Sequence, residues 1–278
     1  MRCAWKELLR ILPQEMQTEV DRLGRSSLME IRLRVGSPGQ LVTGSGIKTM
    51  CSTVTSELLH FVVNTASKYS PWNAATAAKG YITAPGGHRI GLAGECVCRE
   101  GQVSVVKNLT SVCIRVARDF QGIATGIPIE NSLLILGPPG SGKTTLLRDL
   151  IRRISDSSEE SICVVDERGE LYPPNACFPA GRNTDIPTGC EKVQGMDMAL
   201  RTMGPGWIAV DEITSEGDCD AMVRSGWCGV KLLATAHAAG IQDLLAREVY
   251  RPLVNTGLFE HIIVLQKDKS WRLERIRK

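Results

Sequence analysis

Residues Leu133 to Leu147 read LLILGPPGSGKTTLL, in which spaced glycines and a lysine follow an apolar run. The pattern Gly-x-x-x-x-Gly-Lys-Ser/Thr, placed between an apolar strand-like run and a helix-like segment, predicts a phosphate-binding loop. Gly140 and Gly142 permit backbone turns that direct consecutive N–H groups at phosphate oxygens. The following helix presents its positive end to the same anion. We therefore expect a nucleoside triphosphate to bind at this loop.

The residue types of the loop indicate their separate roles. Lys143 is expected to reach the β- and γ-phosphates, and the Thr144 hydroxyl is expected to ligate Mg²⁺. The candidate nucleotide-binding residues are Gly137, Pro138, Pro139, Gly140, Ser141, Gly142, Lys143, Thr144 and Thr145.

A pair of acids at the end of a second apolar strand supplies the expected catalytic side chains. The stretch GWIAVDE covers residues 206–212, and it ends in Asp211 and Glu212. Asp211 is predicted to hold the Mg²⁺ shell. Glu212 is predicted to polarise the attacking water, because phosphoryl transfer depends on positioning and charge compensation.

Two further strands bring polar side chains to the same edge of the predicted sheet. The stretch SICVVDERGEL, residues 161–171, carries Glu167 and Glu170 as candidate catalytic carboxylates. We expect it to be an extra strand between the phosphate-loop strand and the acidic strand. The stretch VKLLATAHA, residues 230–238, ends in Thr235 and His237, and His237 is a candidate sensor of the γ-phosphate.

After residue 131 strands and helices alternate, which is typical of a parallel sheet covered on both faces. The expected strands are 132–136, 161–166, 207–211 and 231–235, and the expected helices are 143–154, 195–203, 215–226 and 240–248. A closing hairpin is expected near the end of the chain, with residues 267–270 as its turn. The chain is thus predicted to be α/β, with a nucleotide-binding domain at 121–278.

The first half has a different pattern. Helical spacing predicts two short helices within residues 4–23, broken at Pro13, and a further helix over 55–70. Residues 28–43 read as a hairpin, and residues 81–118 as an antiparallel meander with glycine-rich turns. These elements predict a smaller α+β domain at 1–120.

Composition excludes several classes of protein. The chain has 278 residues, 43% apolar content and a net charge of +3, which is too small to indicate nucleic acid by itself. Its ten cysteines include no Cys-x-x-Cys pair, so a zinc site is not expected, and their use in apolar runs suits a reducing cytosol. The first residues do not read as a signal peptide, and no apolar run is long enough to span a membrane.

The four stretches together resemble the ATPases of type II and type IV secretion and pilus retraction. The resemblance covers roughly residues 131–248 and implies a RecA-like P-loop core that binds ATP rather than GTP. In the first half, EIRLRVGSP (30–38), GYITAPGGHRIGLAGECV (80–97) and CIRVAR (113–118) are similar to the stage III sporulation AA family of endospore-forming bacteria. Most secretion ATPases have Gly-Glu where this chain has Asp211-Glu212, so the role of Asp211 transfers less directly.

The resemblance implies a homo-hexameric, Mg²⁺-dependent ATPase in the mother-cell cytoplasm, peripheral to the membranes around the forespore. Its implied partners are the membrane proteins of the stage III A sporulation channel. Arg201 matches the arginine that secretion ATPases carry before their acidic strand, and we take it as a catalytic candidate. Other candidates for a charge-compensating arginine are Arg115, Arg118, Arg182 and Arg224.

Two functions of other classes stay open at this point. One is an ATPase stimulated by single-stranded nucleic acid, against which the aromatic content of 5% argues. The other is an assembly scaffold gated by nucleotide without turnover, which needs Lys143 but not Glu212.

Overall fold

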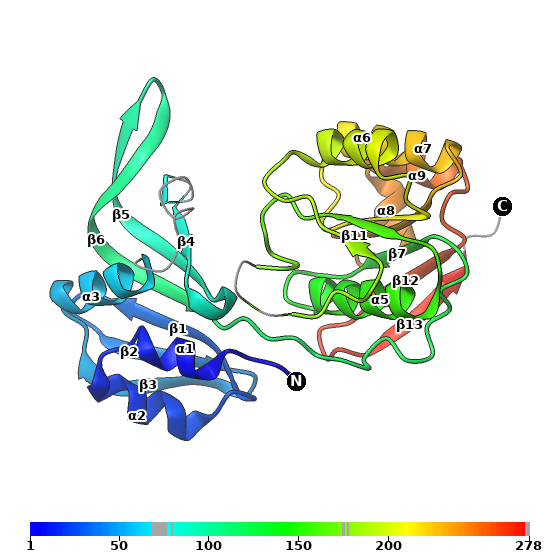
Figure 1. Ribbon diagram of the computed structural model, residues 1–278. Helices are drawn as coiled ribbons and strands as arrows, with labels where there is room; N and C mark the ends of the chain where they lie inside the picture. The colour runs from blue at the N-terminus through cyan, green and yellow to red at the C-terminus, as the bar shows by residue number, and fades with distance from the viewer. Residues whose placement is uncertain (68–76, 79, 174–175, 177, 276–278) are drawn as a thin grey trace. The chain divides into compact units, whose positions relative to one another are not determined.

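The computed structural model describes the whole chain except residues 68–76, 79, 174–175, 177 and 276–278. It divides into two compact units (Figure 1). The first comprises Met1–Asp119 with Pro173–Phe178, and the second comprises Phe120–Tyr172 with Pro179–Lys278. The sequence places the division one residue later, and it does not anticipate that the segment after Tyr172 groups with the first unit.

Two short helices open the first unit. They are α1 (Trp5–Arg10) and α2 (Gln14–Leu23), and Pro13 precedes α2 with a φ of −58°. Proline fixes that angle and lacks a backbone N–H, so it is tolerated before a helix but not within one. The buried apolar side chains of the two helices and of the link between them are Leu8, Ile11, Leu12, Met16 and Val20.

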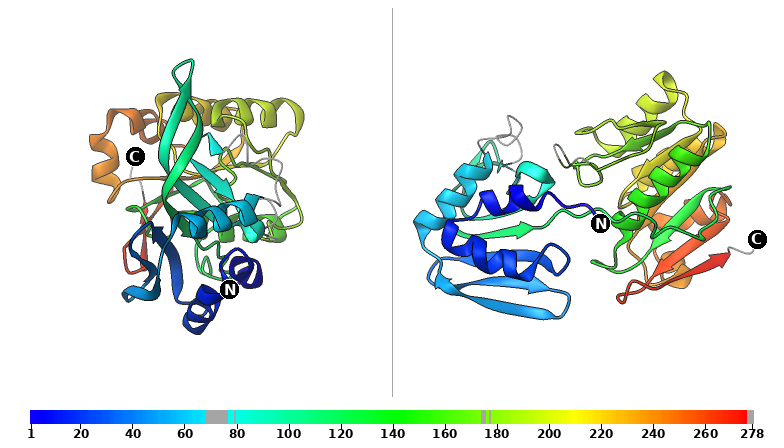
Figure 2. Two further views of the ribbon diagram at one scale, coloured as in Figure 1. Left: turned by 90° about the vertical axis from the view of Figure 1, so that its left-hand side faces the viewer. Right: turned by 60° about the horizontal axis from the view of Figure 1, so that its bottom comes forward.

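An antiparallel sheet with strand order β3-β2-β1-β6-β5-β4 forms the rest of this unit. Its strands are β1 (Leu28–Arg34), β2 (Pro38–Thr43), β3 (Gly46–Thr53), β4 (Tyr81–Thr83), β5 (Arg89–Arg99) and β6 (Gln102–Arg115), with α3 (Ser56–Ser67) between β3 and β4. Helices α1, α2 and α3 bury their apolar side chains with those of one sheet face in a single core (Figure 2). The expected hairpin and meander are present, and the last predicted residues of the third helix lie outside the described residues.

The second unit is built on a mostly parallel sheet with strand order β13-β12-β7-β11-β10-β8-β9. Its strands are β7 (Leu133–Leu136), β8 (Ile162–Val165), β9 (Thr184–Asp185), β10 (Trp207–Val210), β11 (Lys231–Ala236), β12 (His261–Leu265) and β13 (Trp271–Arg275). Only the β12–β13 pair is antiparallel among the described pairs.

Helices cover both faces of this sheet, as continuous apolar strands require. The helices are α5 (Lys143–Ser157), α6 (Lys192–Thr202), α7 (Glu216–Trp227), α8 (Ile241–Ala246) and α9 (Arg251–Asn255). Alternate residues of each strand join two separate cores: α5 packs in one, and α6 to α9 pack in the other (Figure 1). Thus Leu133 and Ile135 face α5, whereas Leu134 and Leu136 face the opposite layer.

The order of the strands corrects one prediction. The strand inserted between the phosphate-loop strand β7 and the acidic strand β10 is β11, not β8. The carboxylates at the end of the strand in residues 161–171 favour that place for it, but they do not determine the strand order. Strand β8 instead pairs with the far side of β10, with Val165 opposite Val210. The edge strand β9 and helix α9 were not predicted.

Among the described residues, no helix combines the length and the apolarity that crossing a membrane would require.

Candidate functional site

The loop after β7 has the backbone that the sequence predicts for phosphate binding. Gly140 has a φ of +73° and Gly142 a φ of +102°, values that side chains disfavour. Gly142 precedes α5, and no side-chain cap to that end is found among the described residues. The first N–H groups of the helix therefore keep their capacity to bind an anion.

Lys143 lies folded back on the loop. Its Nζ atom donates to the carbonyl oxygens of Gly137, at 2.8 Å, and Pro138, at 3.1 Å. Burial lowers the pKa of this ammonium, whereas the nearby carboxylates of Asp211 and Glu212 oppose the shift. Lys143 is 7% exposed, and its ammonium is held by neutral carbonyls, which fits a site that an anion completes.

Ser141 gives a second sign of fit. Its hydroxyl is buried at 1% exposure, and its Oγ atom has no hydrogen-bond partner within the described part of the chain. A buried hydroxyl without a partner costs about 1–3 kcal/mol. A phosphate oxygen bound in the loop could accept a hydrogen bond from this hydroxyl and remove that cost.

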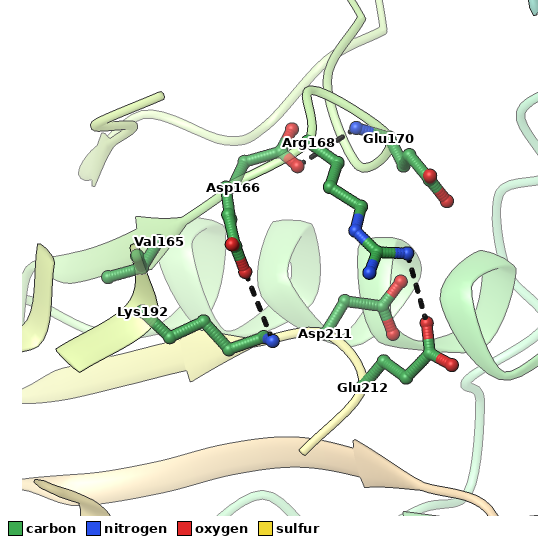
Figure 3. A pocket seen from close by; sticks show the side chains of 8 residues that line it. Val165, Asp166, Arg168, Glu170, Lys192, Asp211 and Glu212 are labelled. Carbon is green, nitrogen blue, oxygen red and sulfur yellow. Dashed lines mark hydrogen bonds and ion pairs between the residues drawn. The ribbon is translucent and has the colours of Figure 1, made fainter. Parts of the chain in front are cut away.

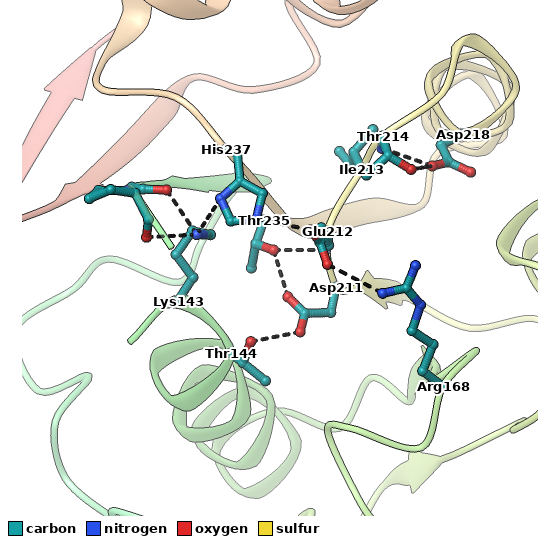
Figure 4. A network of polar contacts seen from close by, with 12 residues as sticks. Lys143, Thr144, Arg168, Asp211, Glu212, Ile213, Thr214, Asp218, Thr235 and His237 are labelled. Atoms are coloured by element: carbon teal, nitrogen blue, oxygen red, sulfur yellow. Dashed lines mark hydrogen bonds and ion pairs between the residues drawn. The ribbon is translucent and has the colours of Figure 1, made fainter. Parts of the chain in front are cut away.

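Thr144 and Asp211 come together as the predicted Mg²⁺ ligands. The Thr144 hydroxyl donates to Oδ2 of Asp211 at 2.8 Å, and the Thr235 hydroxyl donates to Oδ1 at 2.6 Å (Figure 4). No cluster of three or more His, Cys, Asp or Glu side chains that could hold a metal is found in the described residues. One hydroxyl and one carboxylate fit Mg²⁺, which takes its remaining ligands from phosphates and water.

Glu212 adopts a strained backbone conformation that directs it into the site. Its φ is +56°, in the left-handed region that a glutamate rarely occupies. Its backbone N–H donates to the Thr235 hydroxyl at 2.8 Å, and the next N–H, from Ile213, donates to the Thr235 carbonyl at 2.8 Å. The tip of β11 therefore fixes the direction of the Glu212 side chain.

His237 joins the loop lysine to this acid. Its Nδ1 atom lies 3.0 Å from Nζ of Lys143, and its Nε2 atom lies 2.9 Å from Oε1 of Glu212 (Figure 4). An ammonium can only donate, so Nδ1 accepts and the proton of the neutral ring sits on Nε2, where it is donated to Glu212. Lys143, His237 and Glu212 thus form a hydrogen-bonded chain of fixed direction.

The acidic loop after β8 lines a pocket together with Asp211 and Glu212 (Figure 3). Asp166 does not face the predicted phosphates, because its carboxylate accepts the backbone N–H groups of Glu170, Leu171 and Tyr172. Burial is the main cause that raises the Asp166 pKa, and these hydrogen bonds oppose it. Asp166 therefore shapes the loop.

The two acids proposed from this loop have different surroundings. Glu167 pairs with Lys192 at 3.1 Å, and Lys192 also lies 3.6 Å from Asp218. Glu170 lines the pocket, and its backbone N–H holds Asp166 at 2.9 Å. Glu167 is thus engaged in an ion-pair cluster, whereas Glu170 lines the pocket together with Asp211 and Glu212, which follow β10.

Arg168 is a site residue that the sequence reasoning missed. Its Nη1 atom lies 3.9 Å from Oε2 of Glu212, its side chain is 59% exposed, and it lines the same pocket. A single cation within a run of three acids, in DERGE, is the signal that could have identified it.

None of the arginine candidates is among the residues that line this pocket in the described part of the chain, and their catalytic roles stay predictions. Arg201 is exposed in the last turn of α6, at the edge where β10 begins, whereas the phosphate loop lies where the strands end. Each of the other candidates has a partner elsewhere: Arg115 near Glu30, Arg118 on the Ser26 carbonyl, Arg182 on Asp156, and Arg224 near Asp197.

The family described as "Sporulation stage III, protein AA" matches residues 5–275 of this sequence. The chain belongs to this family. Stage III sporulation protein AA of Bacillus subtilis (strain 168) is 32% identical over 281 residues, which cover 95% of this chain and 92% of that protein. The predicted family resemblance is therefore confirmed.

Solved structures agree on the fold of this family member. The ATPase DotB of Legionella pneumophila superimposes with a TM-score of 0.64 at 15% identity, covering 96% of this chain and 80% of DotB. The pilus retraction motor PilT with bound ADP gives a TM-score of 0.64 at 16% identity, covering 95% of this chain and 83% of PilT. These likenesses confirm the predicted α/β P-loop fold of the secretion-ATPase type.

Proposed function

We propose that this sporulation-family protein is a Mg²⁺-dependent ATP hydrolase of the secretion-ATPase type. One observation carries the proposal: Lys143, Thr144, Asp211, Glu212 and His237 come from three separate places, the start of α5 and the ends of β10 and β11, and Thr235 joins them in one hydrogen-bonded network. The solved structure of PilT, which has the same fold, contains bound ADP. That likeness supports a nucleotide as the ligand of this loop.

Each of these residues has a separate role in hydrolysis. Lys143 leaves the loop carbonyls for the β- and γ-phosphates, and the N–H groups of the loop bind the same oxygens. Thr144 and Asp211 would hold Mg²⁺, which when bound neutralises charge on the phosphate oxygens. Glu212 orients the attacking water and takes up its proton as the bond between the γ-phosphorus and the β–γ bridging oxygen breaks.

His237 has a positioning role in this scheme. Its Nε2–H group holds one oxygen of Glu212, so the other oxygen points toward the pocket that Arg168 lines. When Lys143 moves to the phosphates, Nδ1 of His237 loses its donor. The histidine therefore reports on the γ-phosphate through Lys143, as well as through any direct contact.

We further propose that hydrolysis drives a motor. In this proposal the chain assembles as a homo-hexamer in the mother-cell cytoplasm, peripheral to the membrane around the forespore. It powers the membrane proteins of the stage III A sporulation channel. Family membership supports the link to sporulation, and the fold shared with DotB and PilT supports a motor. A subunit interface of this kind needs about 1,000 Å² or more of buried surface.

ATP turnover and ring assembly test the proposal together. The wild-type chain and Lys143→Ala are compared with and without the cytosolic segments of the membrane partners, by phosphate release and by light scattering. We expect turnover and a concentration-dependent ring for the wild type, and neither binding nor turnover for Lys143→Ala. A wild-type chain that binds Mg²⁺-ATP but never releases phosphate is a gated scaffold instead. Stimulation by single-stranded DNA or RNA that falls steeply with salt would favour a nucleic-acid-dependent ATPase.

A further inference from the structure

Two lysines, not one, rest on carbonyl oxygens of the phosphate loop. Lys143 donates to Gly137 and Pro138. Lys269, more than a hundred residues later in the chain, donates from Nζ to the carbonyl oxygen of Gly140. Lys269 belongs to no part of the loop motif. The fold brings it there because β12 lies directly beside β7 in the sheet.

The side chain of Lys269 runs across the loop at the start of α5. A Cβ atom added at Gly142 would lie 3.8 Å from Cδ of Lys269, so the aliphatic stem passes over that glycine. The ammonium group then reaches Gly140. Gly140 and Gly142 are the two loop glycines with positive φ, whose turns aim the N–H groups at an anion.

The turn that carries Lys269 is closed by hydrogen bonds between its own residues. The Asp268 carboxylate accepts the backbone N–H of Ser270 at 3.0 Å and its hydroxyl at 2.6 Å, and the Gln266 N–H donates to the Ser270 carbonyl at 2.9 Å. At the base of the hairpin, a Cβ added at Gly137 would meet the carbonyl oxygen of Leu265 at 3.0 Å. Hairpin and loop are therefore close-packed.

Lys269 also adopts a backbone conformation that lysine disfavours. Its φ is +74°, in the region where glycine or asparagine is ordinarily found in such a turn. A side chain with a β-carbon is strained in that conformation. The turn nevertheless carries a long cationic side chain at the tip of the hairpin, on the side of the loop.

We infer that Lys269 is a second phosphate-binding lysine, which moves from the Gly140 carbonyl to the polyphosphate of a bound nucleotide. The inference rests on the proposed function, since it assumes that the loop binds a nucleotide. Lys143 approaches from the side of His237 and Glu212, where the γ-phosphate is expected. Lys269 approaches over Gly142, at the start of α5, which places it near the phosphates that ADP and ATP share. It therefore strengthens the binding of both nucleotides and leaves the chemical step unchanged.

Binding of ADP and of a non-hydrolysable ATP analogue, each with Mg²⁺, tests this by titration calorimetry on the full chain. Lys269→Ala keeps a β-carbon at the strained position and removes the rest of the side chain, the ammonium included. We expect both dissociation constants to rise about tenfold, the scale of losing one charge near a partly exposed anion. Lys269→Arg should stay within about threefold of the wild type, because the cation is kept. In turnover assays KM should rise with little change in kcat, as for a contact made equally in ground and transition states.

Lys267 supplies the matched control, because it is an exposed lysine of the same turn. Lys267→Ala should bind both nucleotides as the wild type does. Equal losses of affinity in Lys267→Ala and Lys269→Ala would show that only the net charge of the turn matters, and would overturn the inference. Unchanged binding by Lys269→Ala overturns it too. A loss of affinity for the ATP analogue alone would indicate that the ammonium contacts the γ-phosphate, and would reject the assignment to the phosphates that ADP and ATP share. A wild-type chain that binds neither nucleotide instead rejects the proposed function.

Discussion

Nε2 of His237 lies 2.9 Å from Oε1 of Glu212, and this contact connects the phosphate loop to the catalytic acid. Because Lys143 occupies the other ring nitrogen, the histidine is held as a neutral donor. The chain of contacts ends at Arg168, 3.9 Å from the second carboxylate oxygen of Glu212. A change in the position of Lys143 can therefore reach Glu212 through a single ring.

Replacing Glu212 by glutamine separates nucleotide binding from hydrolysis. The amide keeps the size of the side chain and can accept from His237, but it cannot take up a proton. We expect turnover to fall by about 10²–10⁴-fold, the usual contribution of a general base. Nucleotide affinity should stay within about threefold of the wild type. Bound ATP that remains unhydrolysed, measured by rapid filtration and chromatography, is the diagnostic result. Full turnover by Glu212→Gln would show that Glu212 is not the general base.

Arg168 is expected to act in catalysis rather than in stability. It is 59% exposed, and exposed ion pairs of this kind contribute about 0–1 kcal/mol, so Arg168→Ala should barely change the melting temperature. We expect its kcat to fall roughly tenfold to a hundredfold, because a guanidinium beside the γ-phosphate compensates charge in the transition state.

The control for this variant is Arg247→Ala. Arg247 forms a comparable exposed pair with Asp243, 3.2 Å apart, and does not line the pocket of Arg168. Its kcat should equal that of the wild type. If Arg168→Ala retains full kcat, or if both variants lose it equally, Arg168 has no special part in the reaction.

Ser141→Ala should have opposite effects on the empty and the loaded protein. Without nucleotide it removes a buried hydroxyl that has no partner in the described chain, so the free energy of unfolding should stay equal or rise by about 1 kcal/mol. With nucleotide it removes a donor to phosphate, so affinity should fall several-fold. Thermal unfolding with and without Mg²⁺-ADP measures both. A variant that is less stable when empty would indicate a structural hydroxyl.

His88 makes the first unit sensitive to acid. The ring is fully buried; the Ala117 N–H donates to Nδ1 at 3.1 Å, and Nε2 lies 3.0 Å from the Ala4 carbonyl. Burial is the main cause that lowers the pKa of His88 below its ordinary value of 6.5. The unfolded state therefore takes up the proton first, so this stability is fully present above about pH 6.5 and is lost as pH falls toward the lowered pKa.

Hydrogen exchange at the Ala117 amide and in α1 follows this loss locally. We expect protection to decrease between pH 7 and pH 5, after correction for the intrinsic exchange rate, and His88→Gln to show a flatter profile. The comparison concerns the slope with pH, because the variant is also expected to be less stable at every pH. Equal slopes for the two proteins would assign the acid response to other groups.

Much of the second unit could be predicted from local sequence. Each apolar run lies within a few residues of the glycine turn or the polar side chains that follow it, so short-range spacing identifies each strand and its end. Lys143, Thr144, Asp211 and His237 are brought together as predicted. Arg201 is a candidate only because of the family resemblance. In the structure it lies near the start of β10, whereas the phosphate loop lies where the strands end.

Local sequence is enough to identify the buried strands and the side chains at their ends, because those properties depend on neighbouring residues. The strand order, with β11 and not β8 between the loop strand and the acidic strand, appears only in the folded chain. Buried strands are almost equally apolar, so their order depends on how distant helices pack over both faces rather than on any local pattern. That order places Thr235 against Asp211 and Glu212, and it brings Lys269 onto Gly140.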